Sequence, residues 1–482
     1  YAMTSSLVGS EMCIRDSINI NNLNSVVKKD ENNHDNLCRT FHALNTFTAI
    51  IEKFANEFDN IAIEKFTTSR LHIYIPVNIT ADKIIEETIE LVAFAQKLAD
   101  FINKSSKYQS LVNFQIGCGA DYGKYTEFEF TDKDTNLTEM TTIGSPANRA
   151  AKLQSLCDNG KVLISKEVYE LLPQKYKTLF FGDDTATLKL ARKYYDLSAY
   201  GATINDLTKQ LDNKFAERAS RNLDDAATLI NNLNLGDMSI SETCNKLDFS
   251  NLSLKNSKRI EEAAILFADI RGFTKKVDES NLSEMKQLVQ VVLTMMYHEV
   301  LERDGVHVQF QGDRESAVFN KYKNETYDFA IRCILCAMHM LDRVDDINQN
   351  RTDKLNIGIG CSLGNIYAAK IGIRGQKFNL MMGQTVKEAD DAEDNVAGVG
   401  IKSSETEIAI TEELYKHLAS LSGNIASKIK STFSERETNA IKYYISTTRL
   451  SEIQTTTANK IVKENASKAN HNNGIKPWGF WL

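Results

Sequence analysis

The stretch LFADIRGFT, residues 266–274, sets one carboxylate inside an apolar run. It predicts a strand buried on both faces, whose apolar side chains include Ile265, Leu266, Phe267 and Ile270. Asp269 lies near the end of this strand, where burial of an unpaired carboxylate is costly. We therefore expect Asp269 to be paired or to bind a metal ion.

A long helix and a hairpin are predicted after this strand. Residues 283–302 repeat apolar side chains with helical spacing, and residues 306–319, VHVQFQGDRESAVF, alternate as two strands joined at Gly312 and Asp313. The order of these elements predicts a βαββαβ core, in which helices cover one face of an antiparallel sheet, and hence an α+β fold.

The first strand of such a core lies beside the hairpin, so Asp269 and Asp313 are expected to lie together. Carboxylate oxygens suit Mg²⁺ or Mn²⁺. Taken singly, each residue is more simply a strand-end cap or an ordinary turn residue. Their pairing is what favours a metal site.

Segments of the first half of the chain recur about 245 residues later, which indicates two divergent copies of one domain. The recurring pairs are VLISKEVYELL (162–172) with IAITEELYKHL (408–418), ARKYY (191–195) with AIKYY (440–444), and IGCGADYGKY (116–125) with IGCSLGNIY (359–367). At the same offset, IAIEKFTTSRLHIY (61–74) corresponds to the hairpin and ININNLNSVV (18–27) to the first strand.

We expect the copies at residues 17–200 and 258–449, joined by a polar helical connector at 201–257. Residues 450–482 form a polar tail that ends in PWGFWL and holds both tryptophans. Residues 1–16 resemble a translated sequencing adapter, and the fold prediction leaves them out.

Composition narrows the classes of partner. The chain of 482 residues is 42% hydrophobic and 25% charged, with a formal net charge of -7, which is typical of a soluble two-domain protein and argues against a nucleic-acid partner. No apolar run reaches the ~20 residues that span a bilayer, so we expect no membrane partner and a cytoplasmic location. The cysteines are scattered, and Cys333 with Cys336 are expected to be small core residues of a helix.

The sequence resembles a known family. LFADIRGFT, GVHVQFQGDRESAVF, GIGCSLGNI and MMGQTVKEADDAED in the second copy, with TTIGSPANRAAKL in the first, are similar to the catalytic domain of class III nucleotidyl cyclases, the adenylate and guanylate cyclase family. The resemblance implies two such domains paired as an intramolecular pseudo-heterodimer with the active site between them. It also implies two divalent cations, Mg²⁺ or Mn²⁺, and conversion of a nucleoside triphosphate to a 3′,5′-cyclic mononucleotide and pyrophosphate.

The same resemblance implies roles for individual residues of the second copy. Asp269, Asp313 and the backbone of Ile270 would bind metal, and the backbone of Ile270, Gly272 and Phe273 would cradle the triphosphate. Asn22 and Thr68 stand at the metal positions of the first copy, which would therefore have lost its metal site.

The other half of the site is implied in the first copy. Asn148 would orient the ribose, and Lys152, one helical turn later, would stabilise the transition-state phosphate. Lys152 stands where the family has arginine, and an ammonium lacks the forked contact of a guanidinium. The simpler interpretation of both residues is a solvated helix face, but Lys387 and Asp391 at the matching positions of the second copy make the losses complementary.

One competent site and one degenerate site are therefore predicted. A further phosphate-binding lysine is implied near the last strands of the first copy, where Lys189 and Lys193 are both candidates.

The base is expected to be read by two further residues. Adenylate cyclases of this family use a lysine three residues before the hairpin glycine and an Asp or Thr before the following glycine motif. We assign Glu64 and Thr141 to these positions in the competent half, with Gln309 in the other half. A carboxylate only accepts hydrogen bonds, so Glu64 would disfavour adenine and leave GTP and CTP.

A second resemblance, to the pyrimidine cyclases of bacterial Pycsar antiphage systems, rests on Glu64, on Arg314 and on the bare pair of cyclase domains. It implies cCMP or cUMP as the product and a cyclic-nucleotide-responsive effector as an indirect partner. We favour a pyrimidine cyclase in antiviral defence. The alternatives are a guanylate or adenylate cyclase and, from another class, a catalytically inactive nucleotide-binding pseudo-cyclase.

Overall fold

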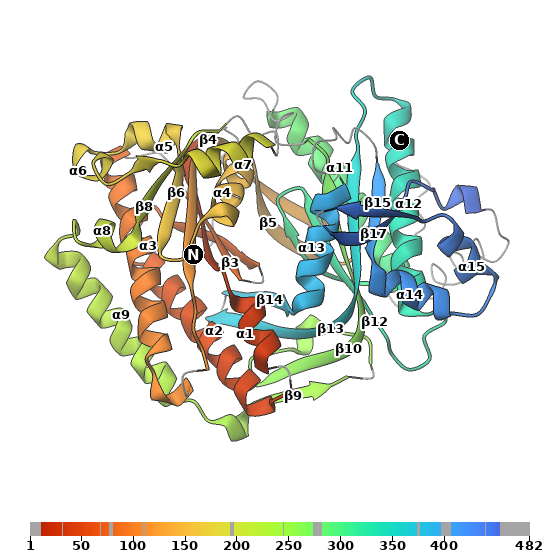
Figure 1. Ribbon diagram of the computed structural model, residues 1–482, viewed down its shortest axis with the longest axis horizontal. Coiled ribbons are helices and arrows are strands. Elements are labelled where there is room, and N and C mark those ends of the chain that lie inside the picture. The colour runs from red at the N-terminus through yellow and green to blue at the C-terminus, as the bar shows by residue number, and fades with distance from the viewer. Residues whose placement is uncertain are drawn as a thin grey trace.

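A computed structural model describes most of the chain, namely residues 11–30, 32–67, 69–76, 81–108, 111–192, 197–243, 245–272, 282–373, 376–396, 406–438 and 440–453. Two mixed sheets with helices dominate it (Figure 1). The first sheet consists of β1 (Glu11–Ile20), β2 (Ala62–Thr67), β3 (Arg70–Pro76), β4 (Ile116–Asp132), β5 (Leu137–Ile143), β6 (Lys161–Ser165), β7 (Phe181–Gly182) and β8 (Ala199–Thr203). The second consists of β9 (Ser239–Glu242), β10 (Asn256–Ile270), β11 (Val306–Gln311), β12 (Arg314–Asn320), β13 (Ile357–Ile373), β14 (Gln376–Met382), β15 (Glu407–Thr411), β16 (Ser434–Thr438) and β17 (Ile441–Ser446).

The two sheets have the same topology. Their strand orders are β2-β3-β1-β4-β6-β8-β7 and β11-β12-β10-β13-β15-β17-β16, and β5 and β14 extend β4 and β13 in the same way. Each strand of the first sheet thus has a counterpart in the second. The predicted α+β class and the two-copy organisation are confirmed.

The long helices cover one face of each sheet. The long pairs are α2 (His34–Ala55) with α3 (Ala81–Asn103) and α11 (Leu282–Glu302) with α12 (Phe329–Gln349). Their apolar faces form the cores, in which the rings of Phe54 and Phe94 stack at 4.0 Å. Cys333 and Cys336 are fully buried in α12, which confirms them as core residues. The remaining helices are α1 (Leu23–Asp30), α4 (Ser145–Leu156), α5 (Lys166–Leu171), α6 (Gln174–Lys177), α7 (Asp184–Arg192), α8 (Ile204–Thr208), α9 (Asn213–Asn231), α13 (Gln384–Val396), α14 (Glu412–Ser420) and α15 (Asn424–Ser431).

Helices α4 and α13 pack directly on β4 and β13, because glycine lets each helix approach the strand. A Cβ at Gly119 would overlap the carbonyl oxygen of Ala150 in α4, and a Cβ at Gly360 would overlap that of Ala389 in α13. The two positions correspond, so α4 and α13 are equivalent helices. Both lie between the two sheets in Figure 1.

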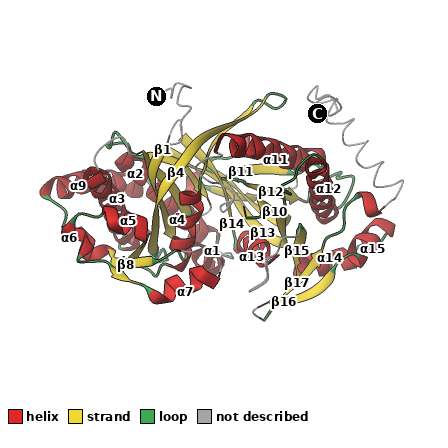
Figure 2. Ribbon diagram, turned by 90° about the horizontal axis from the view of Figure 1, so that it is seen from above, coloured by secondary structure: helices red, strands yellow, loops and turns green. Residues whose placement is uncertain are grey.

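The copies hold each other through two reciprocal arms. The β4–β5 hairpin extends away from its sheet toward α11 (Figure 2), and Phe130 near its tip is buried in the core of the second copy. The β13–β14 hairpin places Tyr367 and Ile371 in the core of the first copy. Each hydrophobic core therefore includes side chains from both copies.

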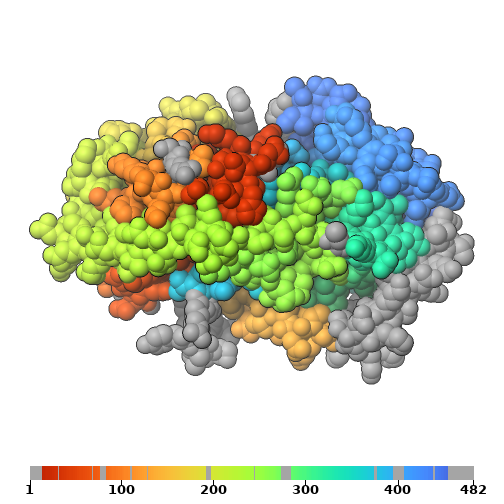
Figure 3. All heavy atoms as spheres, turned by 90° about the horizontal axis from the view of Figure 1, so that it is seen from below, coloured from red at the N-terminus to blue at the C-terminus, as the bar shows by residue number. Residues whose placement is uncertain are grey.

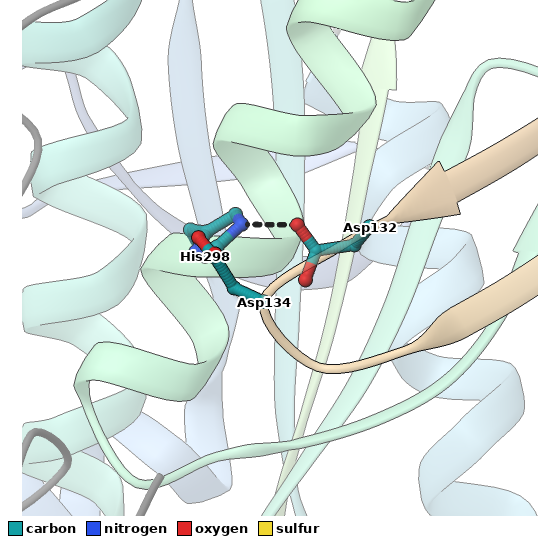
Figure 4. Close-up of side chains that lie close together, drawn as sticks. All are labelled: Asp132, Asp134 and His298. Atoms are coloured by element: carbon teal, nitrogen blue, oxygen red, sulfur yellow. Dashed lines mark hydrogen bonds and ion pairs between the residues drawn. The ribbon is translucent and has the colours of Figure 1, made fainter. Parts of the chain in front are cut away.

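Polar contacts fix the tip of each arm. His298 Nε2 of α11 and Asp132 Oδ1 of the first arm lie 2.9 Å apart and point toward each other (Figure 4). At the second arm, the N–H of Ile373 donates to Glu52 Oε2 of α2 at 3.0 Å. These contacts set the relative position of the two sheets.

The connector joins the copies along one face of the molecule (Figure 3). Helix α9 packs against α2 and α3, where Arg218 forms an ion pair with Glu90, and β9 pairs in parallel with β10. Residues 201–203 belong to β8, and residues 11–16, which the sequence prediction left out, form part of β1 and pair with β3 and β4. The tail from residue 454 and its tryptophans lie outside the described residues. Among the helices that the structure describes, none is long and apolar enough to cross a membrane.

Candidate active site

The structure brings Asp269 and Asp313 together. Asp269 is the second-to-last residue of β10, and Asp313 follows Gly312 in the two-residue turn between β11 and β12. Gly312 adopts a φ of 68°, which glycine accepts without strain. Asp269 is close enough to raise the pKa of Asp313, and Asp313 is only 4% exposed while Asp269 is half-buried.

Electrostatics make this pair a good fit for a divalent cation. Burial raises the pKa of Asp313 well above its usual range, and the charge of Asp269 raises it further. Burial also raises the pKa of Asp269, although Arg314, Arg271 and Lys152 act in the opposite direction. Two buried carboxylates this close repel each other unless a proton or a cation lies between them. Their oxygens form the donor set that Mg²⁺ and Mn²⁺ prefer.

The first copy has a neutral pair at the corresponding place, but in a different register from the one we predicted. Asn19 pairs with Gly117 as Asp269 pairs with Gly358, so Asn19 is the counterpart of Asp269. Ser69, next to the first residue of β3, corresponds to Asp313, and its Oγ donates to Asn19 Oδ1 at 2.6 Å. The loss of both acids in this copy is thus visible in the structure.

The assignment of Asn22 to the metal position was therefore wrong. Its side chain instead donates to the carbonyl of Asn113 at 2.6 Å, beyond the end of β1. Thr68 lies outside the described residues. The error arose because residues 18–22 repeat Ile and Asn, and such a pattern fits more than one alignment equally well.

Asn148 and Lys152 lie on α4, which begins after Gly144 with proline in its first turn. Asn148 is half-buried, and the side chain of Lys152 is 27% exposed. The ammonium of Lys152 lies 3.2 Å from Asp394 Oδ1 of α13 and is close enough to Asp269 to lower its pKa. Lys152 of the first copy therefore reaches the carboxylate pair of the second.

Lys387 and Asp391, at the matching positions on α13, form an ion pair with each other and are about half exposed. Ile270 is buried at the end of β10, and Gly272 adopts a φ of 66°, while Phe273 lies outside the described residues. Lys189 is exposed on α7, and Lys193 lies outside the described residues.

Glu64 does not take the place in the site that we expected. A bulge in β2 pairs Lys65 with His72, just as a bulge in β11 pairs Gln309 with Ser316, so Lys65 is the counterpart of Gln309. The carboxylate of Glu64 is 5% exposed and forms an ion pair with Arg15. It also accepts hydrogen bonds from Thr142 N–H at 2.9 Å and Thr141 Oγ1 at 3.2 Å.

These contacts occupy the oxygens of Glu64 within the first copy. Burial alone would raise its pKa, but Arg15 and Lys65 lower it to about 2. The sequence alignment had matched Thr68 with Asp313, whereas Ser69 is the counterpart of Asp313, and Glu64 was displaced by the same one position.

Thr141 and Lys65 both contact the hairpin of the second copy. The N–H of Gly312, next to Asp313, donates to Thr141 Oγ1 at 3.0 Å. The ammonium of Lys65 lies 2.9 Å from Glu139 Oε1 and donates to the carbonyl of Phe310 at 2.6 Å. Thr141 thus lies next to the turn that holds Asp313, and Lys65, the counterpart of Gln309, contacts the same hairpin.

Sequence reasoning missed the carboxylates of α13 that line the same site. Asp390, Glu393 and Asp394 form ion pairs with Arg314, with Arg271 and Arg314, and with Lys152, respectively. Their spacing of three and four residues puts them on one helix face, which was the available signal. Partners from separate elements could not be read from that spacing.

Two other groups of side chains in the described residues have ligand atoms close enough for a metal ion. They are Asp132, Asp134 and His298, shown in Figure 4, and Glu299, Glu302 and His339. Glu299 already forms ion pairs with Arg303 and Arg343, and Asp132 accepts hydrogen bonds from Thr135. Existing partners therefore account for both groups.

Comparisons with known proteins agree with this fold. Residues 255–447 match the model of the adenylate and guanylate cyclase catalytic domain. Soluble guanylate cyclase gcy-31 of Caenorhabditis elegans is 25% identical over 262 residues, which are 52% of this chain and 36% of that protein, so the match spans about a third of the relative's length. A class III adenylyl cyclase-like ATP-binding protein from Pseudomonas aeruginosa has a similar fold, with a TM-score of 0.64 and 18% identity over 93% of this chain and 90% of that one.

Proposed function

We propose that this chain, whose residues 255–447 are a class III nucleotidyl cyclase domain, converts a nucleoside triphosphate to a 3′,5′-cyclic mononucleotide and pyrophosphate at one site between its two copies. The observation that carries the proposal is the close pair of Asp269, which is half-buried, and Asp313, which is buried, with Lys152 and Thr141 of the other copy beside it. The matching pair in the first copy, Asn19 and Ser69, is uncharged. This asymmetry supports a single site.

In this proposal the second copy holds the phosphates. Asp269, Asp313 and the carbonyl of Ile270 would bind the divalent cations that class III cyclases use, which lower the pKa of the ribose 3′-hydroxyl and screen the phosphate charge. A Cβ at Gly272 would meet no atom within 4 Å, and in this proposal the triphosphate would approach the backbone of the turn through that open space. The substrate carries its own nucleophile, so these groups act by orientation and charge stabilisation.

The first copy holds the sugar and the transition state. Asn148 orients the ribose so that its 3′-oxygen faces the α-phosphate. Lys152 exchanges its contact with Asp394 for the phosphate oxygens as negative charge develops there. Attack of the 3′-oxygen forms the new P–O bond and releases pyrophosphate.

We place ATP first among the substrates, in place of the pyrimidine nucleotide that the sequence favoured. The preference for a pyrimidine nucleotide, and with it the antiphage role and its effector, rested on Glu64 as the base reader together with Arg314 and the bare pair of cyclase domains. Glu64 is bonded to Arg15, Thr141 and Thr142, and Lys65 occupies the base-reading register. In this family a lysine together with Thr or Asp is the pair that reads adenine. Lys65 and Thr141 stand at these positions, and in this proposal the buried ammonium of Lys65 would exchange its contacts with Glu139 and the carbonyl of Phe310 for the base.

Binding without turnover is the second candidate. Lys152 replaces the family's arginine and is paired with Asp394, and both features lower the rate expected for the phosphate step. The Pseudomonas aeruginosa protein of similar fold is itself described as adenylyl cyclase-like and ATP-binding. A nucleotide dissociation constant measured without product would identify this outcome.

The deciding experiment is incubation of the full chain with Mn²⁺ and each of ATP, GTP, CTP and UTP, followed by chromatography of the products. We expect cAMP and an equal amount of pyrophosphate from ATP. Product from CTP or UTP alone would contradict the assignment of adenine as the base and would support a pyrimidine cyclase. No product from any of the four would refute the cyclase proposal.

A further inference from the structure

Helix α13 presents one acidic face to the candidate site. Asp390, Glu393 and Asp394 lie on this face at a spacing of three and four residues. Each contacts a cation beside the carboxylate pair: Asp390 lies 2.6 Å from Arg314, Glu393 lies 2.6 Å from Arg271 and 3.1 Å from Arg314, and Asp394 lies 3.2 Å from Lys152. Glu393 is the member of this face with two cationic partners.

The two arginines that Glu393 binds are sequence neighbours of the two aspartates. Arg314 directly follows Asp313 in the hairpin, and Arg271 follows Asp269 by two residues at the end of β10. Both side chains are 14% exposed, and that of Glu393 is 3% exposed. One carboxylate therefore links the strand that holds Asp269 to the turn that holds Asp313.

Further contacts hold each arginine in this orientation. Arg314 lies 4.1 Å above the ring of Phe267, and Arg271 also donates to the carbonyl of Glu393 at 2.7 Å. A Cβ at Gly358 would overlap the guanidinium of Arg271, so glycine is what lets this side chain cross the strand to α13.

The first copy contains the same bridge with a neutral residue at its centre. Gln154 occupies the position of Glu393, because a Cβ at Gly119 would overlap its backbone N just as a Cβ at Gly360 would overlap that of Glu393. Its amide accepts from Arg70 at 2.9 Å and donates to Asn21 at 2.9 Å. The copy without the acid pair thus also lacks the acidic bridge.

We propose that Glu393 is a positioning residue of the cyclase site. By binding Arg271 and Arg314 at once, it fixes the distance between Asp269 and Asp313 and neutralises guanidinium charge that would otherwise repel a divalent cation. This inference rests on the proposed function in one respect, the binding of metal by the two aspartates. It does not require that the chain turns over a nucleotide.

The test compares Mn²⁺ binding by the full-length wild type and Glu393→Gln without nucleotide, by electron paramagnetic resonance of free Mn²⁺. We expect the dissociation constant of the variant to rise about tenfold, because the surroundings of the acid pair become one charge more positive. The cyclase rate should fall in proportion at low Mn²⁺ and recover at saturating Mn²⁺. A residue that only stabilises the fold would not produce this recovery. Gln154→Glu, the matched control in the first copy, should leave the dissociation constant within twofold of wild type.

Each outcome decides the inference. A dissociation constant for Glu393→Gln within twofold of wild type overturns it. If that variant does not fold, Asp390→Asn, whose side chain is 49% exposed, replaces it with an expected weakening of about threefold, and an unchanged constant again overturns the inference. If wild type binds Mn²⁺ and makes no product, the proposed function is refuted. The Mn²⁺ dissociation constants of wild type and Glu393→Gln then still test the role of Glu393. A wild type that binds no Mn²⁺ refutes this inference and the metal assignment together.

Discussion

Replacing Asp313 by asparagine is expected to abolish cyclase activity and to stabilise the chain when no metal is present. Asp313 is buried, and Asp269 is half-buried and close enough to raise the pKa of Asp313. At ~4 Å and an effective dielectric constant of about 20, two unit charges repel each other by about 4 kcal/mol, and the neighbouring arginines offset part of this energy. We expect a net gain of about 1–2 kcal/mol in the free energy of unfolding, which raises the midpoint of a domain of this size by about 2–8 °C.

The gain should depend on pH. Folding raises the pKa of Asp313, so the folded chain binds more protons than the unfolded chain above the usual carboxylate range, and wild type loses stability as pH rises. Asparagine removes this contribution, and the difference between the two proteins should therefore be larger at pH 8 than at pH 5.

Thermal unfolding in EDTA at the two pH values measures this difference. When the measurement is repeated with Mn²⁺, the metal should raise the midpoint of wild type but not that of Asp313→Asn. The matched change in the first copy, Ser69→Ala, removes a neutral hydrogen bond to Asn19. It should lower the free energy of unfolding by about 1 kcal/mol and lower the midpoint accordingly. A lower midpoint for Asp313→Asn in EDTA at pH 8 would refute the reasoning.

Three further expectations concern other parts of the chain. Lys152→Ala should lower the cyclase rate at least a hundredfold, and Lys387→Ala should leave it within twofold, because Lys387 lies at the degenerate site; equal losses in the same assay would contradict a single site. Burial alone would lower the pKa of His307, but two neighbouring glutamates raise it to about 10. The stability that the charge of His307 contributes is thus complete below pH 6.5 and is lost as pH rises toward 10. The thermal unfolding midpoint of His307→Gln should therefore fall less steeply between pH 8 and 10 than that of wild type. Phe130→Ala should lower the free energy of unfolding by about 3–5 kcal/mol, because its ring is buried in the core of the other copy, and an unchanged calorimetric midpoint would argue against the interlocked arms.

The repeats and the alternation of apolar residues were sufficient to predict the fold. Segments such as 162–172 and 408–418 became β6 with α5 and β15 with α14, which occupy equivalent places in the two sheets. The contact between Asp269 and Asp313 followed from topology alone, since a first strand and a hairpin are neighbours in a βαββαβ core. Local pattern and chain order therefore fixed the place of the acid pair.

Register was the part that pattern did not determine. Alternating Ile and Asn allowed β1 to be aligned three residues away from its actual partner. Matching Thr68 in place of Ser69 with Asp313 exchanged Lys65 for Glu64. The role of Glu393 was beyond reach for another reason. Its two arginines come from different elements, and only the packing of α13 on β13 brings them to one carboxylate.

The contrast between the acid pair and its neutral counterpart, Asn19 with Ser69, bears on how such a chain accumulates mutations. In an assembly of identical subunits every substitution appears twice, and exchanging the acid for an amide would remove the metal ligand from both sites at once. Within one polypeptide the same exchange is confined to one copy. Each copy in this chain can therefore diverge without keeping the residues that the other copy supplies. In the site that we propose, one copy would hold metal and the other would hold the sugar and the developing charge.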